Sequence, residues 1–207
     1  ELDQIRQCAN ISETEAALIR EPSRSIVVVD GKEPHKLSRH IAPGLNQLGV
    51  FLPYSPLHHL LLQSFGRAVV ASSANVSGEP VLTGKQQVQQ RLSHITDACL
   101  HHNRPIARPA DDSVIRIIVG LARPLRIGRG LTPVELTLPT AIGKPTLAVG
   151  GHMKNTVALA WGKRIVISPH IGDLDTALSV EVHRRAIEDL VQFFDVTPQA
   201  VACDLLR

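Results

Sequence analysis

Residues 68–80 read Ala-Val-Val-Ala-Ser-Ser-Ala-Asn-Val-Ser-Gly-Glu-Pro, and the stretch turns from apolar to polar at its middle. A β-branched apolar run that ends in Ser, Asn and Gly is typical of a buried strand that opens into a loop. In open α/β sheets, ligands usually bind at the carboxyl ends of the strands, so the loop is a candidate site. The alternative is an ordinary turn, because Ser and Asn favour turns through local hydrogen bonds. The polar side chains of the candidate site are Ser72, Ser73, Asn75 and Ser77.

Composition narrows the possible classes of protein. The 207 residues are 43% hydrophobic, which is enough for a sizeable core, but only 3% aromatic, so a nucleic-acid site built on stacked rings is not expected. A net charge of +3 suits anionic small molecules as well as weak attraction to RNA. Three scattered cysteines indicate neither a disulfide framework nor a zinc finger and favour the cytoplasm, and no apolar run is long enough to predict a membrane span. Because the chain begins with Glu1 rather than Met, we expect a segment of a longer protein.

Local signals predict helices and strands in alternation over the first part of the chain. Ser12 and Glu15 have the spacing of a capping box, which predicts a helix over residues 16–19. Ser55 and Pro56 have the form of an N-cap followed by a first-turn proline. The predicted strands are residues 25–30, 49–52, 67–71, 98–101, 113–119 and 124–127, and the further helices are residues 57–65 and 83–92. Together they predict a mixed sheet with helices packed against it.

A second unit follows a change in composition. Residues 131–145 are rich in Thr and Pro, which is typical of a boundary between domains. Beyond it, three short apolar runs separated by Gly-containing turns predict a β-meander, and a helical pattern follows them. The predicted elements are strands at 146–149, 156–161, 164–168 and 200–203 and a helix at 176–194. The fold class is therefore α/β in two domains, residues 1–135 and 146–207, joined by a linker at 136–145.

Three further polar groups join the opening loop as candidates. Asp111-Asp112-Ser113 stands at the start of a strand, where it could orient a substrate or a hydrated Mg²⁺. Arg126 and Arg129, with glycines beside them, suit a phosphate group. His102-Asn103-Arg104 adds another cation. Each has a plainer interpretation as a solvated turn or a surface ion pair.

The combination resembles a known family. The Ser-Ser-Ala-Asn-Val-Ser-Gly-Glu-Pro loop, Asp-Asp-Ser-Val at 111–114 and Leu-Arg-Ile-Gly-Arg-Gly at 125–130 resemble the YrdC-like domain in its HypF version. Residues 147–156 and 168–174 are similar to the start of the carbamoyl-transfer domain of the same family, which has the actin-like (ASKHA) fold. The resemblance implies a YrdC-like twisted mixed sheet with helices, followed by the start of an actin-like α/β domain.

The resemblance implies an ATP-dependent carbamoyltransferase of NiFe-hydrogenase maturation. Such an enzyme forms carbamoyl-adenylate from ATP and the carbamate released from carbamoyl phosphate. It passes the carbamoyl group to the C-terminal Cys of the partner HypE, for synthesis of the cyanide ligand. The loop is shared with threonylcarbamoyl-adenylate synthases of tRNA modification, which remain the alternative, and a third possibility is an RNA-binding or scaffolding module. Neither a membrane nor a nucleic acid is expected as partner.

The site residues follow from the resemblance and from side-chain chemistry. Ser73 and Asn75 match the family's Ser-x-Asn motif, and Arg126 and Arg129 are candidates on chemical grounds for the same catalytic site. His170, in the segment after a strand, and Asp173 are the expected transfer-site residues. The expected nucleotide-binding residues are Ser72, Asp112, Ser113, Lys154, Asn155 and Thr156.

The family pattern also implies parts outside this chain. A basic Lys and Arg pair is expected upstream of Glu1, and zinc or another metal is expected only in segments outside residues 1–207, so we expect low activity from the segment alone. ATP and Mg²⁺ are the expected cofactors. The cysteines lack a neighbouring base and are not expected to be nucleophiles. Structural roles rather than metal binding are expected for His35, His40, His58, His59, His101 and His102.

Overall fold

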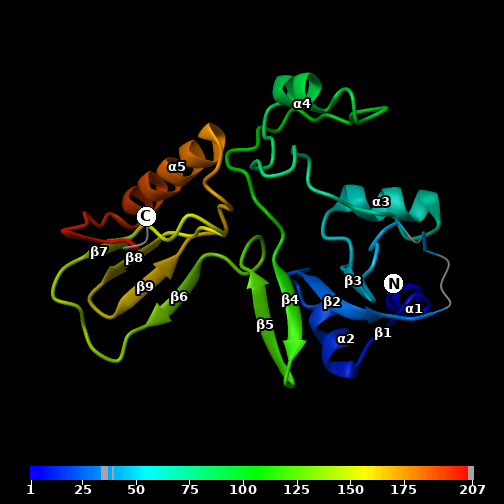
Figure 1. Cartoon of the computed structure of the whole chain (residues 1–207), viewed down its shortest axis with the longest axis horizontal. Helices are drawn as coiled ribbons and strands as arrows, with labels where there is room; N and C mark the ends of the chain where they lie inside the picture. Colours follow the sequence, from blue (N-terminus) through cyan, green and yellow to red (C-terminus); the bar gives the residue numbers. More distant parts are fainter. Residues whose placement is uncertain (34–36, 39, 205–207) are drawn as a thin grey trace. The chain divides into compact units, whose positions relative to one another are not determined.

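The computed structural model describes residues 1–33, 37–38 and 40–204 and is drawn in Figure 1. It divides into two compact units. The first unit consists of Glu1–Ser72 and Asp112–Leu131, and the second of Ser73–Asp111 and Thr132–Arg207. Each unit has its own sheet and its own apolar core.

The first unit is organised around strand β2. It pairs in parallel with β4 and antiparallel with β1 and β3, and β4 pairs antiparallel with β5. Val27 and Val29 alternate on one face of β2 and are fully buried, together with Ile19 of helix α2. The elements are α1 (Leu2–Arg6), β1 (Ala9–Asn10), α2 (Glu13–Arg20), β2 (Ile26–Gly31), β3 (Gln47–Val50), α3 (Pro56–Phe65), β4 (Val114–Ile118) and β5 (Leu121–Arg126).

Helix ends follow the sequence signals closely. The Ser12 hydroxyl accepts the Glu15 amide, and the Glu15 carboxylate accepts the Ser12 amide, so the predicted capping box is confirmed. The Ser55 hydroxyl accepts the His58 amide, and Gly66 ends α3 in the left-handed conformation at φ +73°. These signals act within one turn of helix, and for that reason the sequence alone predicts them.

The second unit contains the predicted meander. Strands β7, β8 and β9 pair antiparallel in succession, β10 pairs in parallel with β7, and β6 pairs with β9 at the other edge. Helix α5 lies against this sheet, as Figure 1 shows. Its Leu190 belongs to the buried cluster with Leu159 and Val166. The elements are α4 (Lys85–Leu92), β6 (Val134–Thr137), β7 (Thr146–Ala148), β8 (Ala158–Trp161), β9 (Arg164–Ile167), α5 (Ala177–Phe194) and β10 (Ala200–Ala202).

Two predicted strands are wrong. Residues 67–71 and 98–101 carry no strand, and Val70 and Leu100 are each 74% exposed. An apolar run becomes a strand only where a neighbouring strand pairs with its N–H and C=O groups, and no described strand does so here. A strand was also missed, because β6 occupies residues assigned to the end of the first domain and to the linker. The alternation Val-Glu-Leu-Thr at 134–137 was the available signal.

Two further findings concern the cysteines and the helices. Cys8, Cys99 and Cys203 are free thiols. Within the described residues, no helix has both the length and the apolar character to cross a bilayer.

Candidate functional site

The loop that follows residue 71 is a compact turn held together by Asn75. The Asn75 Nδ2 donates to the carbonyl oxygens of Val76 at 3.0 Å and Glu79 at 2.9 Å. Its Oδ1 is buried and has no hydrogen-bond partner among the described residues. The side chain therefore stabilises the turn and also leaves one acceptor atom unused. Both interpretations of this loop, a local turn and a site, are compatible with that geometry.

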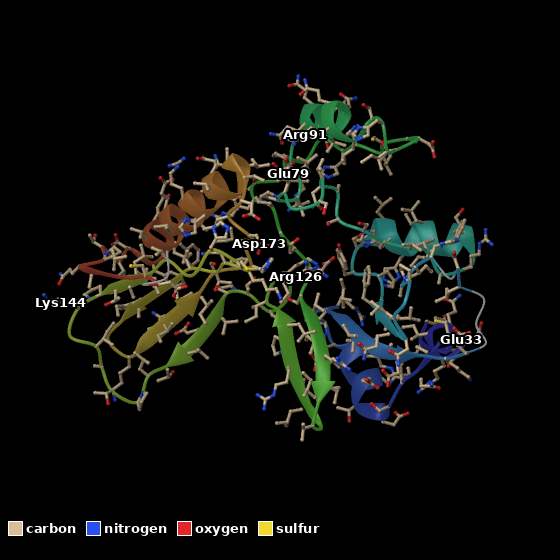
Figure 2. All side chains as sticks on the ribbon, in the orientation of Figure 1. Glu33, Glu79, Arg91, Arg126, Lys144 and Asp173 are labelled. Atoms are coloured by element: carbon tan, nitrogen blue, oxygen red, sulfur yellow. The ribbon has the colours of Figure 1, made fainter. Side chains whose placement is uncertain are left out.

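Glu79 connects the same loop to helix α4. Its Oε1 lies 2.6 Å from an Arg91 nitrogen, and Figure 2 labels both residues. The second oxygen, Oε2, is buried without a partner in the described part of the chain. The hydroxyl-bearing residues around them, Ser72, Ser73 and Ser77, are exposed. The loop thus offers exposed hydroxyl groups beside buried acceptors.

Arg129 and Arg126 hold the Asp112 segment within the first unit. The Arg129 Nε donates to the Asp112 carboxylate at 2.8 Å, and its two terminal nitrogens donate to the carbonyls of Ser23 and Arg24, both at 3.1 Å. The Arg126 Nε donates to the Asp112 carbonyl at 2.8 Å. No described residue hydrogen-bonds the terminal nitrogens of Arg126, so Arg126 retains more capacity for an external anion than Arg129 does.

Tyr54 completes this cluster and was missed by the sequence analysis. The Arg129 guanidinium lies 3.5 Å from the centre of the Tyr54 ring, a cation–π contact. Burial raises the pKa of the Tyr54 phenol above its usual 10.0, the Asp112 carboxylate raises it further, and Arg129 acts in the opposite direction. The available signal was weak, because Tyr54 is the single tyrosine of the chain and precedes a helix cap.

Ser113 is fully buried, and its hydroxyl is engaged within the chain. It accepts the Gly128 amide at 2.9 Å and donates to the Arg129 carbonyl at 2.9 Å. These bonds position the backbone that carries Arg126 and Arg129. The role of Ser113 as a phosphate ligand stays a prediction.

The two neighbouring carboxylates, Asp111 and Asp112, each have a bonding partner within the chain. Asp112 is bonded to Arg129, and Asp111 lies 2.9 Å from the His170 Nδ1. No group of three or more His, Cys, Asp or Glu side chains within the described residues is arranged to hold a metal ion. Arg129 already bonds the Asp112 carboxylate, and the His170 imidazole bonds the Asp111 carboxylate. The described surroundings of the two carboxylates therefore do not fit Mg²⁺. His35 lies outside the described residues.

In the second unit, the turn after β7 brings the expected nucleotide-binding and transfer residues together. The Lys154 amide donates to the Asp173 carboxylate at 2.6 Å, and the Asn155 amide donates to the Gly172 carbonyl at 2.9 Å. The Asn155 Nδ2 donates to the carbonyls of Val149 and Gly151, while its buried Oδ1 has no partner in the described residues. Thr156 follows directly in the chain.

His183 of α5 supports the same turn and was not predicted. Its Nε2 lies 3.0 Å from the Val149 carbonyl oxygen, which also accepts Asn155. No local pattern indicates this contact, because the two partners are 34 residues apart.

A cleft of about 490 Å³ opens within the second unit. One wall is helix α5, including Val182 and Phe194, and another contains Pro80 and His170. Most of the lining side chains are apolar, and His170 adds a polar ring. The expected transfer residue His170 therefore lies at a cleft rather than in a closed core.

The structure thus sorts the predicted site residues into two sets. Asp112, Ser113, Arg126 and Arg129 come together in the first unit. Lys154, Asn155, His170 and Asp173 come together in the second, which also contains Ser73 and Asn75. Among the described residues, His102 makes a local contact, with the Arg104 amide at 3.1 Å.

Comparison with known proteins identifies the first part of the chain. Residues 1–128 match the family model of Sua5, YciO and YrdC, described as "Telomere recombination". The chain belongs to this Sua5–YciO–YrdC family. Residues 141–206 match a second model, the HypF Kae1-like domain. A Sua5–YciO–YrdC unit followed by a Kae1-like unit confirms the predicted fold class and the predicted resemblance to HypF.

Individual relatives agree with this result. Carbamoyltransferase HypF from Synechocystis sp. is 40% identical over 204 residues, which cover 99% of this chain and 27% of that protein. The crystal structure of full-length HypF in the phosphate- and nucleotide-bound form has a TM-score of 0.93 and 35% identity, covering 99% of this chain and 32% of that one. Sua5 from P. abyssi, complexed with L-threonine, has a TM-score of 0.54 at 16% identity, over 100% of this chain and 73% of that one, and shares the fold alone. The chain spans about a quarter of the length of the curated relatives it matches.

Proposed function

We propose that the chain is part of an ATP-dependent carbamoyltransferase of NiFe-hydrogenase maturation. The enzyme forms carbamoyl-adenylate from ATP and carbamoyl phosphate and passes the carbamoyl group to the C-terminal Cys of HypE, for synthesis of the cyanide ligand. The observation that carries the proposal is the order of the two family matches in one chain that is 40% identical to a carbamoyltransferase HypF. A threonylcarbamoyl-adenylate synthase would not account for the Kae1-like match at 141–206.

The adenylation step belongs to the loop of Ser73 and Asn75. A carbamate oxygen attacks the α-phosphorus of ATP and expels pyrophosphate, a step that depends mainly on positioning and charge neutralisation. The exposed Ser73 hydroxyl can donate to a phosphate oxygen. The buried, unpartnered Asn75 Oδ1 can accept from the carbamoyl amide, which would satisfy both groups. Ser72, Asp112, Ser113 and the guanidinium groups of Arg126 and Arg129 are assigned to the adenylation step as well.

The transfer step belongs to the second unit. Lys154, Asn155 and Thr156 are assigned to nucleotide phosphates, as their position between the first two strands of an actin-like fold suggests. The Asn155 side-chain amide donates to two carbonyl oxygens of the turn and so stabilises the backbone that would contact the phosphates. His170 and Asp173 are assigned to the transfer site. Mg²⁺ arrives with ATP as its counter-ion, and zinc or another metal is expected only outside this chain.

The same assignment also predicts the cellular compartment, the partners and the activity of the isolated segment. We place the enzyme in the cytoplasm, with HypE as protein partner and with neither a membrane nor a nucleic acid. We expect the isolated segment to have low activity, because the family's basic pair and remaining modules are expected outside it.

ATP–pyrophosphate exchange tests the proposal. A full-length protein that contains this chain should catalyse exchange that depends on carbamoyl phosphate, and Ser73→Ala should reduce it at least about tenfold, since one charge-assisted bond contributes about 1.5–3 kcal/mol. Asn75→Ala should reduce it further, because it also removes two bonds of the loop.

Ser77→Ala is the matched control, since Ser77 is an exposed serine of the same loop with no assigned role. Exchange that requires threonine and bicarbonate instead would replace the proposal with a threonylcarbamoyl-adenylate synthase. Tight RNA binding without any exchange would favour a nucleic-acid module.

A further inference from the structure

His170 and Asp111 form a hydrogen-bonded pair beside the cleft of the second unit. The His170 Nδ1 lies 2.9 Å from the Asp111 Oδ2, and the two side chains are 17% and 23% exposed. An ionised carboxylate can only accept, so Nδ1 carries the proton and Nε2 presents a lone pair. Nε2 has no hydrogen-bond partner among the described residues. The ring is thus fixed at one nitrogen and available at the other.

Of the two aspartates near His170 in the second unit, Asp111 is the one whose carboxylate contacts the His170 ring. Asp173 accepts the Lys154 amide at 2.6 Å and stabilises the turn after β7. Asp111 is 59 residues from His170 in the sequence, so no local pattern could indicate the pair.

A second His–Asp pair in the same unit shows what is special about this one. The His152 Nε2 lies 2.7 Å from the Asp175 Oδ1, but those side chains are 61% and 65% exposed, and neither lines the cleft. Exposed pairs of this kind contribute little. The His170–Asp111 pair has the same two functional groups, but its side chains are much less exposed to water.

The cleft supplies the surroundings in which the pair would act. Charged groups that line it with His170 are Arg108, Glu181, Arg185 and Asp189. Arg108 and Asp189 neutralise each other at 2.6 Å, and Glu181 is paired with Arg184 at 2.6 Å. Asp111 is the carboxylate in contact with the ring. The remaining lining is largely apolar, which limits competition from water.

We propose that His170, oriented by Asp111, accepts the proton of the acceptor thiol during carbamoyl transfer. The inference rests on the proposed function and assigns the base of its second step. The S–H proton moves to Nε2, and the thiolate electron pair forms a bond to the carbamoyl carbon. The C–O bond to the phosphate breaks, AMP leaves with that electron pair, and the imidazolium returns its proton to water. Asp111 is a positioning residue, because it holds the tautomer that makes Nε2 the acceptor.

The test measures carbamoylation of a synthetic peptide ending in cysteine by the full-length protein. His170→Ala should lower kcat for transfer by about a hundredfold or more, and added imidazole should restore part of it. His170→Asn should show a similar loss, although its amide can still donate to Asp111, and Asp111→Asn should lower kcat while KM stays the same. Asp175→Asn, which breaks the exposed pair, should transfer at the wild-type rate.

The failures of the two proposals can be distinguished. Transfer at the wild-type rate by His170→Asn, or a loss in His170→Ala that imidazole does not restore, overturns the assignment of the base. Wild-type protein that shows neither carbamoyl phosphate-dependent exchange nor transfer overturns the proposed function, and this inference with it.

Discussion

Arg126 and Arg129 show how two similar residues of one motif have different tasks. Arg129 uses its guanidinium on Asp112 and on the carbonyls of Ser23 and Arg24, and it stacks on Tyr54. Arg126, as far as the described residues show, donates one bond, to the Asp112 carbonyl. The motif indicated two cations, but it could not indicate this division, since Ser23 lies 106 residues before Arg129.

We predict that Arg129→Lys destabilises the turn at Ser23 and Arg24. A lysine cannot reproduce the planar, multiply bonded geometry, and the loss should be about 2 kcal/mol. Native-state hydrogen exchange of the full-length protein measures it as faster opening of residues 23–26. Arg126→Lys is the control and should cost less than about 1 kcal/mol there. Equal effects of the two substitutions would contradict the division of tasks.

Helices and strands differ in how far the sequence predicts them. The N-terminal caps of α2 and α3 follow from signals within one turn, and the β7–β9 meander follows from short turns between apolar runs. The predicted strand at 67–71 depends on distant pairing, which a local pattern does not contain. Likewise, the candidate residues could be named from motifs, but contacts such as Asp111 with His170 needed the fold.

The turn after β7 gives a prediction at this scale. Gly150 has φ +69°, and a Cβ there would overlap the Thr156 carbonyl oxygen and lie 2.7 Å from the Asn155 Nδ2. Gly150→Ala should therefore destabilise the turn by about 2–4 kcal/mol and weaken nucleotide binding, as equilibrium dialysis with ATP would measure.

Gly162 provides the matched comparison for that turn. It also has positive φ, +52°, but nothing lies within 4 Å of a Cβ there. Gly162→Ala should cost about 1 kcal/mol and leave ATP binding intact. Unchanged binding in Gly150→Ala would show that the turn does not hold the nucleotide.

At the scale of the whole molecule, the family matches and the compact units divide the chain differently. The first family match ends at residue 128 and the second begins at residue 141. The compact second unit, by contrast, also includes Ser73–Asp111, which lies inside the first family match. Strand β6, which pairs with β9, begins before the expected linker. The boundaries at 1–135, 136–145 and 146–207 therefore stay a prediction. Each family match nevertheless contains residues of this chain that are assigned to one of the two proposed steps.

The central claim is that the chain binds nucleotide phosphates at two places, one for adenylation and one for transfer. A crystal structure of the full-length protein with Mg²⁺ and a non-hydrolysable ATP analogue tests this most directly. We expect phosphate oxygens within about 3.2 Å of the Ser73 hydroxyl and, in a second site, of the turn at Lys154–Thr156. An analogue bound elsewhere, with phosphates at neither position, would contradict the account.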